Sequence, residues 1–237
     1  MKSYFRLAGS LLALALFSGS VLAQAPLNPD VGDVDSFGHS VIYLGAAQTI
    51  TVQVLDPCAP QDPTRIRCTN LLPDGAETPF KEDDLTVMHL PARATKTLIC
   101  SSYTPQLNLQ YTNVPTAPRF GSFSMAADVT IENSLLNDPA LINPVTGQPF
   151  GGKIVVSQSN YHEQRGLGTT YETLQTAVSS MCSGLISRRN LIQRYGLSSA
   201  QATAFFQRPI TLRFGASGRI VTGVVTFTYV ERLFGDN

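Results

Sequence analysis

The sequence contains no tryptophan, and only 14% of its 237 residues are charged, well below the roughly 25% of an ordinary soluble domain. With 43% hydrophobic residues and a formal net charge of zero, it does not fit a disordered chain, which combines low hydrophobicity with high net charge. It has no glycine period of the collagen kind. After residue 23, no apolar run approaches the ~18 residues that a membrane-spanning helix needs. These absences leave a globular protein of one or two domains.

The motifs of common catalytic and metal sites are also missing. The chain has no C-x-x-C pair, and its histidines, His39, His89 and His162, lie far apart in the sequence. No G-x-S-x-G, S-x-x-K or P-loop motif is present. We therefore expect no metal site and no cofactor. A Ser-His-Asp triad built from distant positions stays open, because such triads are defined by geometry and not by spacing.

Residues 1–23 have the three parts of a secretory signal. Lys2 and Arg6 supply the positive start, an apolar core follows, and Val21-Leu22-Ala23 provides the residue sizes that a signal peptidase reads. We expect cleavage after Ala23 and a periplasmic, extracellular or cell-surface location. An exported protein does not meet a promoter, so we expect no nucleic-acid partner for the helix-turn-helix-like stretch around Gly196.

Export changes the meaning of the four cysteines, because an even number in an oxidising compartment indicates disulfides. We prefer the pairs Cys58–Cys68, closing a proline-rich loop, and Cys100–Cys182, joining a strand to a helix. Closing the short loop contributes about 2–3 kcal/mol in the chain-entropy model. Four free thiols are the alternative.

Most of the chain after an irregular acidic leader at residues 24–39 reads as short strands. In Thr49-Ile-Thr-Val-Gln-Val, apolar side chains fall on every second residue, the period of a half-buried strand. Similar runs recur up to residue 159, with a long loop expected at 57–84. Many short strands separated by turn residues favour an antiparallel β-sandwich-like domain, which we place at residues 40–237.

One stretch, residues 169–208, predicts a two-helix insertion near the C-terminus. Thr169 to Glu172 have the spacing of a capping box, and apolar residues then recur at three- and four-residue steps. Gly196 is expected to end the first helix. Ser198 is expected to open a second one that runs through Phe206. After it, we expect a closing hairpin turning at 215–218, with 221–230 as an exposed edge strand of the kind seen in pilus subunits and adhesins.

The charges divide unevenly along the chain. Residues 24–172 hold 15 acidic and 8 basic side chains, net −7, whereas residues 173–237 hold 7 Arg and 2 acids, net +5. Either these arginines pair with the acidic half inside one fold, or they form an exposed basic face for an acidic partner. That face would comprise Arg188, Arg189, Arg194, Arg208, Arg213 and Arg219.

The mainly β architecture, the charge division and the missing motifs favour an exported, non-catalytic binding or structural component of a bacterial cell envelope or surface assembly. Its partner would be a protein, a second copy of the chain, or an anionic envelope polymer. The alternative is a secreted hydrolase acting on an envelope polymer, with His89 or His162 as base. A third hypothesis, a small-ligand carrier, needs a sizeable apolar cavity.

Overall fold

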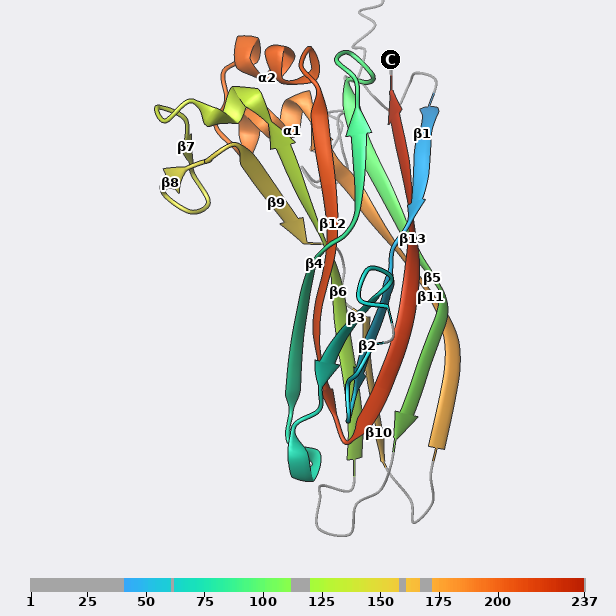
Figure 1. Ribbon diagram of the computed structural model, residues 1–237. Helices are drawn as coiled ribbons and strands as arrows, with labels where there is room; N and C mark the ends of the chain where they lie inside the picture. The colour runs from blue at the N-terminus through green and yellow to red at the C-terminus, as the bar shows by residue number, and fades with distance from the viewer. Residues whose placement is uncertain (1–40, 61, 112–119, 158–160, 167–171, 237) are drawn as a thin grey trace, which may run out of the picture.

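The computed structural model describes residues 41–60, 62–111, 120–157, 161–166 and 172–236. The fold is mainly β, as predicted, and is an elongated sandwich of two sheets with two short helices at one end (Figure 1). The proposed signal, the leader, His39 and the first part of the expected capping box lie outside the described residues.

The first sheet has the order β11-β5-β13-β2-β3, with β1 also beside β13, and its strand pairs are antiparallel except for β2 and β3. It consists of β1 (Val41–Gln48), β2 (Thr51–Leu55), β3 (Ile66–Asn70), β5 (Thr97–Tyr111), β11 (Glu172–Ser187) and β13 (Gly223–Asp236).

The second sheet is antiparallel in the order β10-β6-β12-β4, with β9 also beside β6. It consists of β4 (Thr78–Leu90), β6 (Phe120–Asn133), β9 (Lys153–Ser157), β10 (Tyr161–Gly166) and β12 (Ile210–Val221), and a small hairpin of β7 (Ile142–Asn143) and β8 (Gln148–Pro149) lies beside it near the helices.

Strict alternation of buried side chains in β6 and β13 builds the interior of the sandwich. Near the starts of β4, β6 and β13, the rings of Phe80, Phe123 and Phe227 pack together with centroids 5.9–6.4 Å apart. The two sheets are also joined by a buried hydrogen bond, since the Tyr229 hydroxyl of β13 donates to the Gly215 carbonyl of β12 at 2.8 Å. Burial raises the pKa of Tyr229 far above its ordinary value.

The two helices lie between β11 and β12. Helix α1 (Arg188–Gln193) ends just before Gly196, whose φ of +70° is the left-handed conformation that glycine adopts readily. Helix α2 (Ser199–Phe206) starts with a capping box, in which Ser198 and Gln201 satisfy each other's backbone N–H groups. The predicted stop at Gly196 and start at Ser198 are confirmed.

The predicted helix over residues 169–187 is wrong where the structure describes it. From Glu172 to Ser187 the chain is strand β11, paired antiparallel with β5. The segment is rich in Ser and Thr and contains Gly184, all weak helix formers. Pairing with β5 therefore outweighs an apolar spacing that fits a helix only approximately.

The expected hairpin turn at 215–218 is also wrong, because β12 runs through it without a break. A Cβ at Gly218 would collide with the Ser124 carbonyl and the Phe80 ring, so this glycine permits close packing of neighbouring strands. The chain instead reverses at Thr222, with φ of +54°, and crosses from the second sheet to the first.

Strand β13 is not an edge strand. It pairs with β5 on one side along its whole length, and with β2 and β1 on the other. Its long apolar alternation reflects a central position, where one face of the strand packs against the opposite sheet. The predicted exposed edge at 221–230 therefore does not exist.

The proline-rich region 57–84 contains more regular structure than predicted. The disulfide Cys58–Cys68 is present, as predicted, and ties the loop to β3. Strand β3 lies parallel to β2, and β4 begins at Thr78, inside the region expected to be a loop.

The second predicted cysteine pair would join two strands, and not a strand and a helix as expected. Cys100 on β5 and Cys182 on β11 are directly opposite in the antiparallel register. Opposed Cα atoms in such a ladder are about 4.5–5.5 Å apart, inside the range of roughly 4.4–6.8 Å that a disulfide requires. The Cys100–Cys182 bond stays a prediction, which a Cys100–Cys182 peptide in a non-reducing digest would establish and a Cys58–Cys100 peptide would overturn.

Candidate binding site at the helical end

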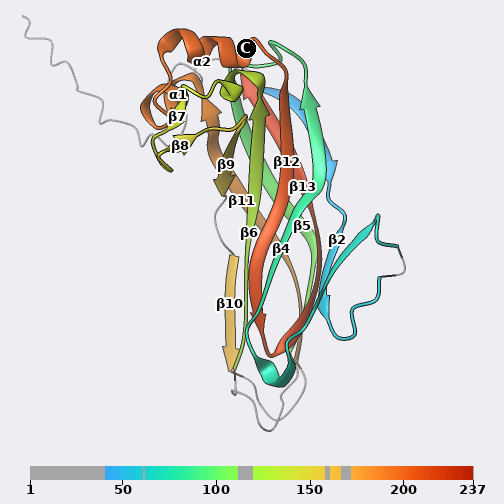
Figure 2. The same ribbon diagram turned by 60° about the vertical axis from the view of Figure 1, so that its left-hand side comes forward.

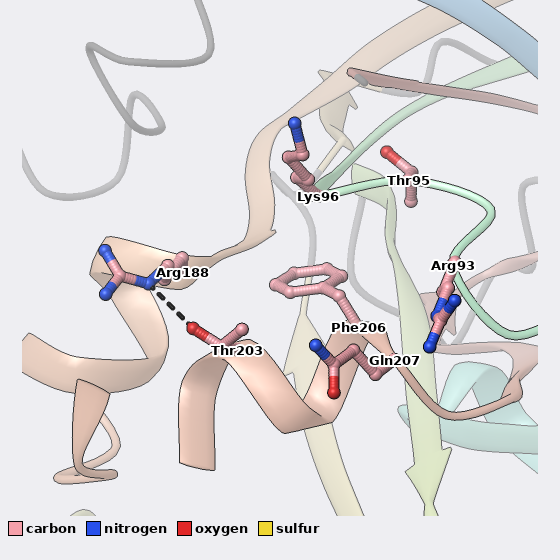
Figure 3. A pocket seen from close by; sticks show the side chains of 7 residues that line it. All are labelled: Arg93, Thr95, Lys96, Arg188, Thr203, Phe206 and Gln207. Atoms are coloured by element: carbon pink, nitrogen blue, oxygen red, sulfur yellow. Dashed lines mark hydrogen bonds between the residues drawn. The ribbon is translucent and has the colours of Figure 1, made fainter. Parts of the chain in front are cut away.

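The helical end is the end of the sandwich that carries α1, α2 and the 91–96 connection between β4 and β5. A pocket of about 430 Å³ lies there, within the usual range for small-ligand sites. Figure 3 shows its lining, which comes from that connection and from both helices: Arg93, Thr95, Lys96, Arg188, Thr203, Phe206 and Gln207.

Backbone hydrogen bonds fix the 91–96 connection against α2 and β13. The Arg93 N–H donates to the Phe206 carbonyl at 2.9 Å, and Arg93 itself has a left-handed φ of +63°. The Lys96 N–H donates to the Asp236 carbonyl at 2.7 Å. The buried Thr95 hydroxyl accepts from the Asp236 N–H at 2.8 Å. Arg93 and Lys96 therefore stand on an anchored backbone although their side chains are exposed.

Arg188 is positioned by α2. Its Nε donates to the Thr203 hydroxyl at 3.2 Å, and its guanidinium also donates to the Ser199 hydroxyl. Thr203 in turn donates to the Ser199 carbonyl at 3.0 Å. These bonds hold the guanidinium at the surface of α2, yet the oxygens that accept them carry no formal charge.

The pocket combines an apolar interior with a basic rim. The Phe206 ring lies at its centre, while the charged ends of Arg93, Lys96 and Arg188 point outward around it (Figure 3). None of these three side chains contacts a carboxylate within the part of the chain that the structure describes. Such a site can hold an apolar group that carries a negative charge beside it.

The six arginines predicted to form one basic face do not do so. Arg213 lies in the second sheet, 2.8 Å from Glu132 and 3.3 Å from Asp84. Its pKa is raised because it donates to both carboxylates, with Glu132 the stronger influence. Arg219, further along β12, pairs with Glu77 at 3.5 Å. For these two, internal pairing with the acidic half is the correct interpretation.

The other four arginines belong to the helical end. Arg189 donates to Gln193 at 3.2 Å, Arg194 lies 5.8 Å from the Tyr195 ring centre, and Arg208 reaches the Ser134 hydroxyl at 3.4 Å. Among them only Arg188 lines the pocket.

Sequence reasoning missed Arg93 and Lys96. The sequence analysis assigned them no role, and no spacing links them to Phe206, more than a hundred residues later. The sequence did contain an indication of a basic site here, since the six-residue connection 91–96 holds two basic residues and no acidic one.

The described histidines line neither the pocket at the helical end nor the second pocket, which is described next. His89 is exposed, with Nδ1 3.1 Å from the Thr211 hydroxyl, and His162 is an exposed residue of β10. Within the described ranges, no group of three or more His, Cys, Asp or Glu residues is arranged to hold a metal ion.

A second pocket of about 340 Å³ lies beside the first turn after β6 and is lined by polar groups. Its most buried polar residue, Asn133, already donates to the Phe205 carbonyl at 2.9 Å and accepts from the Leu135 N–H at 3.0 Å. Glu132 there is engaged by Arg213. We therefore assign the candidate binding site to the first pocket.

Within the described residues, no helix is long and apolar enough to cross a membrane. Neither a comparison with models of known protein families nor a search of curated proteins finds a match to this chain.

Proposed function

We propose that this chain is an exported, non-catalytic binding or structural component of a bacterial cell envelope or surface assembly, and that it meets an acidic partner with the pocket at its helical end. The observation that carries the proposal is the group of Arg93, Lys96 and Arg188 around Phe206, whose charges meet no carboxylate among the described residues. Cations of this kind attract an acidic surface over long distances and suit carboxylate groups at contact.

Export is supported by the three-part signal at residues 1–23 and by the Cys58–Cys68 disulfide, which persists in oxidising compartments. In a bacterial host the secreted product is expected to begin at Gln24. Intact mass of the purified protein measures this directly, and a product that keeps residues 1–23 in the cytoplasm would contradict export.

The partner chemistry is an acidic protein surface, of which a second copy of the chain is one example, since residues 24–172 carry a net charge of −7. An anionic envelope polymer presents the same charge. Sedimentation velocity at about 0.01 M and about 1 M ionic strength, where the Debye length is about 30 Å and about 3 Å, tests self-association. Oligomers are expected at low salt and monomers at high salt, whereas a monomer at both rejects self-association.

A further inference from the structure

The apolar part of the pocket at the helical end is an aromatic ring that the core holds in place. Phe206 belongs to the buried cluster at that end and is only 6% exposed. Its ring packs edge-on against that of Phe205, with centroids 5.3 Å apart. Because this ring is already fixed, it loses little conformational freedom when an apolar group packs on it, which favours binding of such a group.

Arg188 presents a defined pair of hydrogen-bond donors beside this ring. The edge of its guanidinium formed by Nε and Nη2 is taken by α2, since Nε donates to the Thr203 hydroxyl and Nη2 to the Ser199 hydroxyl. Nη1 makes no hydrogen bond within the described residues. The edge formed by Nη1 and Nη2 is therefore available for two parallel hydrogen bonds to one carboxylate.

The remaining polar groups of the lining suit the backbone and the charges of a polypeptide. Gln207 directly follows Phe206, and its side-chain amide has no hydrogen bond in the part of the chain that the structure describes. Such an amide can accept a peptide N–H and donate to a peptide carbonyl. Arg93 lies on the opposite side of the Phe206 ring from Arg188 (Figure 3), and Lys96 adds a third positive charge.

We infer that the pocket takes the C-terminal residue of an acidic partner polypeptide. The apolar side chain of that residue packs on Phe206, its α-carboxylate binds the available edge of Arg188, and its backbone N–H donates to Gln207. Acidic residues just before the terminus then face Arg93 and Lys96. A terminal residue carries all three groups on one Cα, which suits a pocket of about 430 Å³, and capture of a C-terminal carboxylate is a recurring mode of peptide recognition.

This inference rests on the proposed function, since both use the basic rim, and it adds which part of the partner enters the pocket. Helices α1 and α2 lie at one end of the elongated sandwich in both views (Figures 1 and 2). Among the described residues, a chain end can therefore approach the pocket without crossing either sheet. An acidic surface needs only the charges of the rim, whereas a terminus also uses the Phe206 ring, so the two modes can be separated.

Titration of the ¹⁵N-labelled secreted protein with short peptides, followed by NMR at about 0.15 M ionic strength, provides the test. The probe is acetyl-Gly-Asp-Gly-Phe with a free carboxyl terminus. Two peptides of the same net charge are its controls: acetyl-Asp-Asp-Gly-Phe amide lacks the terminal carboxylate, and acetyl-Gly-Asp-Gly-Ser with a free terminus lacks the apolar side chain.

The probe should give saturable shifts of the amides of residues 91–96 and 203–207 and of the Arg188 Nε–H signal. Both control peptides should bind about tenfold more weakly, because each loses one of the two main contacts. Arg188→Gln should weaken binding of the probe by about tenfold. Arg213→Gln is the matched control, since it removes an arginine that is paired with Glu132 and Asp84, and binding should be unchanged.

Three results would overturn the inference: no saturable shift around the pocket, equal binding of the amidated peptide, or tighter binding of octanoate than of the probe. The last would indicate a site for free fatty acids. None of them removes the proposed function, whose test is the salt dependence of association. Conversely, a protein that binds the probe as expected but stays monomeric at both ionic strengths would support this inference and reject self-association alone.

Discussion

The body of the sandwich and its helical end use arginine in opposite ways. On β12, Arg213 and Arg219 pair with carboxylates from β4, β6 and the loop before β4, so the body neutralises its own charge. At the helical end, Arg188 binds hydroxyl oxygens and stands with Arg93 and Lys96 around an apolar pocket. Arg188, Arg213 and Arg219 all belong to the arginine-rich part of the sequence after residue 172, yet the fold pairs two of them with carboxylates and leaves Arg188 at the rim of the pocket.

The two regions also differ in the interactions that hold their side chains in place. The body is an aromatic cluster between two sheets, whereas the basic rim depends on backbone anchoring of exposed side chains. Packing of apolar groups contributes far more to stability than exposed charges do. Changes in the body should therefore affect unfolding, and changes at the rim should affect binding.

The largest effect is expected from Phe227→Ala in the body. The ring is fully buried, with its centre 5.9 Å from that of Phe80 and 6.4 Å from that of Phe123. Removing it should lower the free energy of unfolding by about 3–5 kcal/mol, from lost burial and the cavity left behind. Urea unfolding measures this, and Phe120→Ala, at a ring that is 39% exposed, is the control. An equal loss in both variants would contradict the placement of the core.

Tyr229→Phe should have an intermediate effect, because it removes the hydrogen bond between the two sheets without opening a cavity. We expect a loss of about 1–2 kcal/mol near neutral pH. The pKa of Tyr229 is raised in the folded state by burial, followed by the charges of Glu231 and Asp128. The wild-type contribution should therefore be complete below the unfolded pKa near 10 and decline as the pH rises above it.

Urea unfolding of Tyr229→Phe and wild type at neutral pH and above pH 10 measures the change. The difference between the two proteins should shrink as the pH rises. A difference that stays constant across this range would show that the Tyr229 hydroxyl does not stay protonated in the folded state.

The smallest effect on stability is expected at the charges themselves. Arg213→Gln removes contacts to Glu132 and Asp84 and should lower the free energy of unfolding by about 0.5 kcal/mol at low salt, less at high salt, because the pair is partly exposed. Arg188→Gln should leave unfolding unchanged, since no carboxylate among the described residues depends on it. Measuring the free energy of unfolding of both variants at two salt concentrations compares them. A larger loss for Arg188→Gln than for Arg213→Gln would contradict the assignment of Arg213 to the stability of the body and of Arg188 to the outward-facing rim.

The sequence was sufficient for the class of fold and for several local features. Alternation in Thr49 to Val54 predicted β2, the cysteine spacing predicted Cys58–Cys68, and Gly196 and Ser198 marked helix ends. Each of these features depends on residues that are close together in the chain, so the stretch of sequence that shows the pattern also contains the residues that cause it.

The misassigned elements depend on distant partners. Strand β11 is held by β5, some seventy residues earlier, and the glycines of β12 are required by approaching backbones and not by a turn. Because distant partners also build the candidate site, only part of it was predicted from the sequence. Arg188 was identified from the charge run, while Arg93 and Lys96 join it only because the 91–96 connection is bonded to Phe206 and Asp236.

The most direct test of the outward-facing role of the helical end compares two double variants that each remove two positive charges. Sedimentation velocity at low ionic strength should show that Arg93→Gln with Arg188→Gln abolishes association, whereas Arg213→Gln with Arg219→Gln leaves it intact. If the two pairs reduce association equally, net charge alone governs it and the pocket at the helical end is not the binding surface.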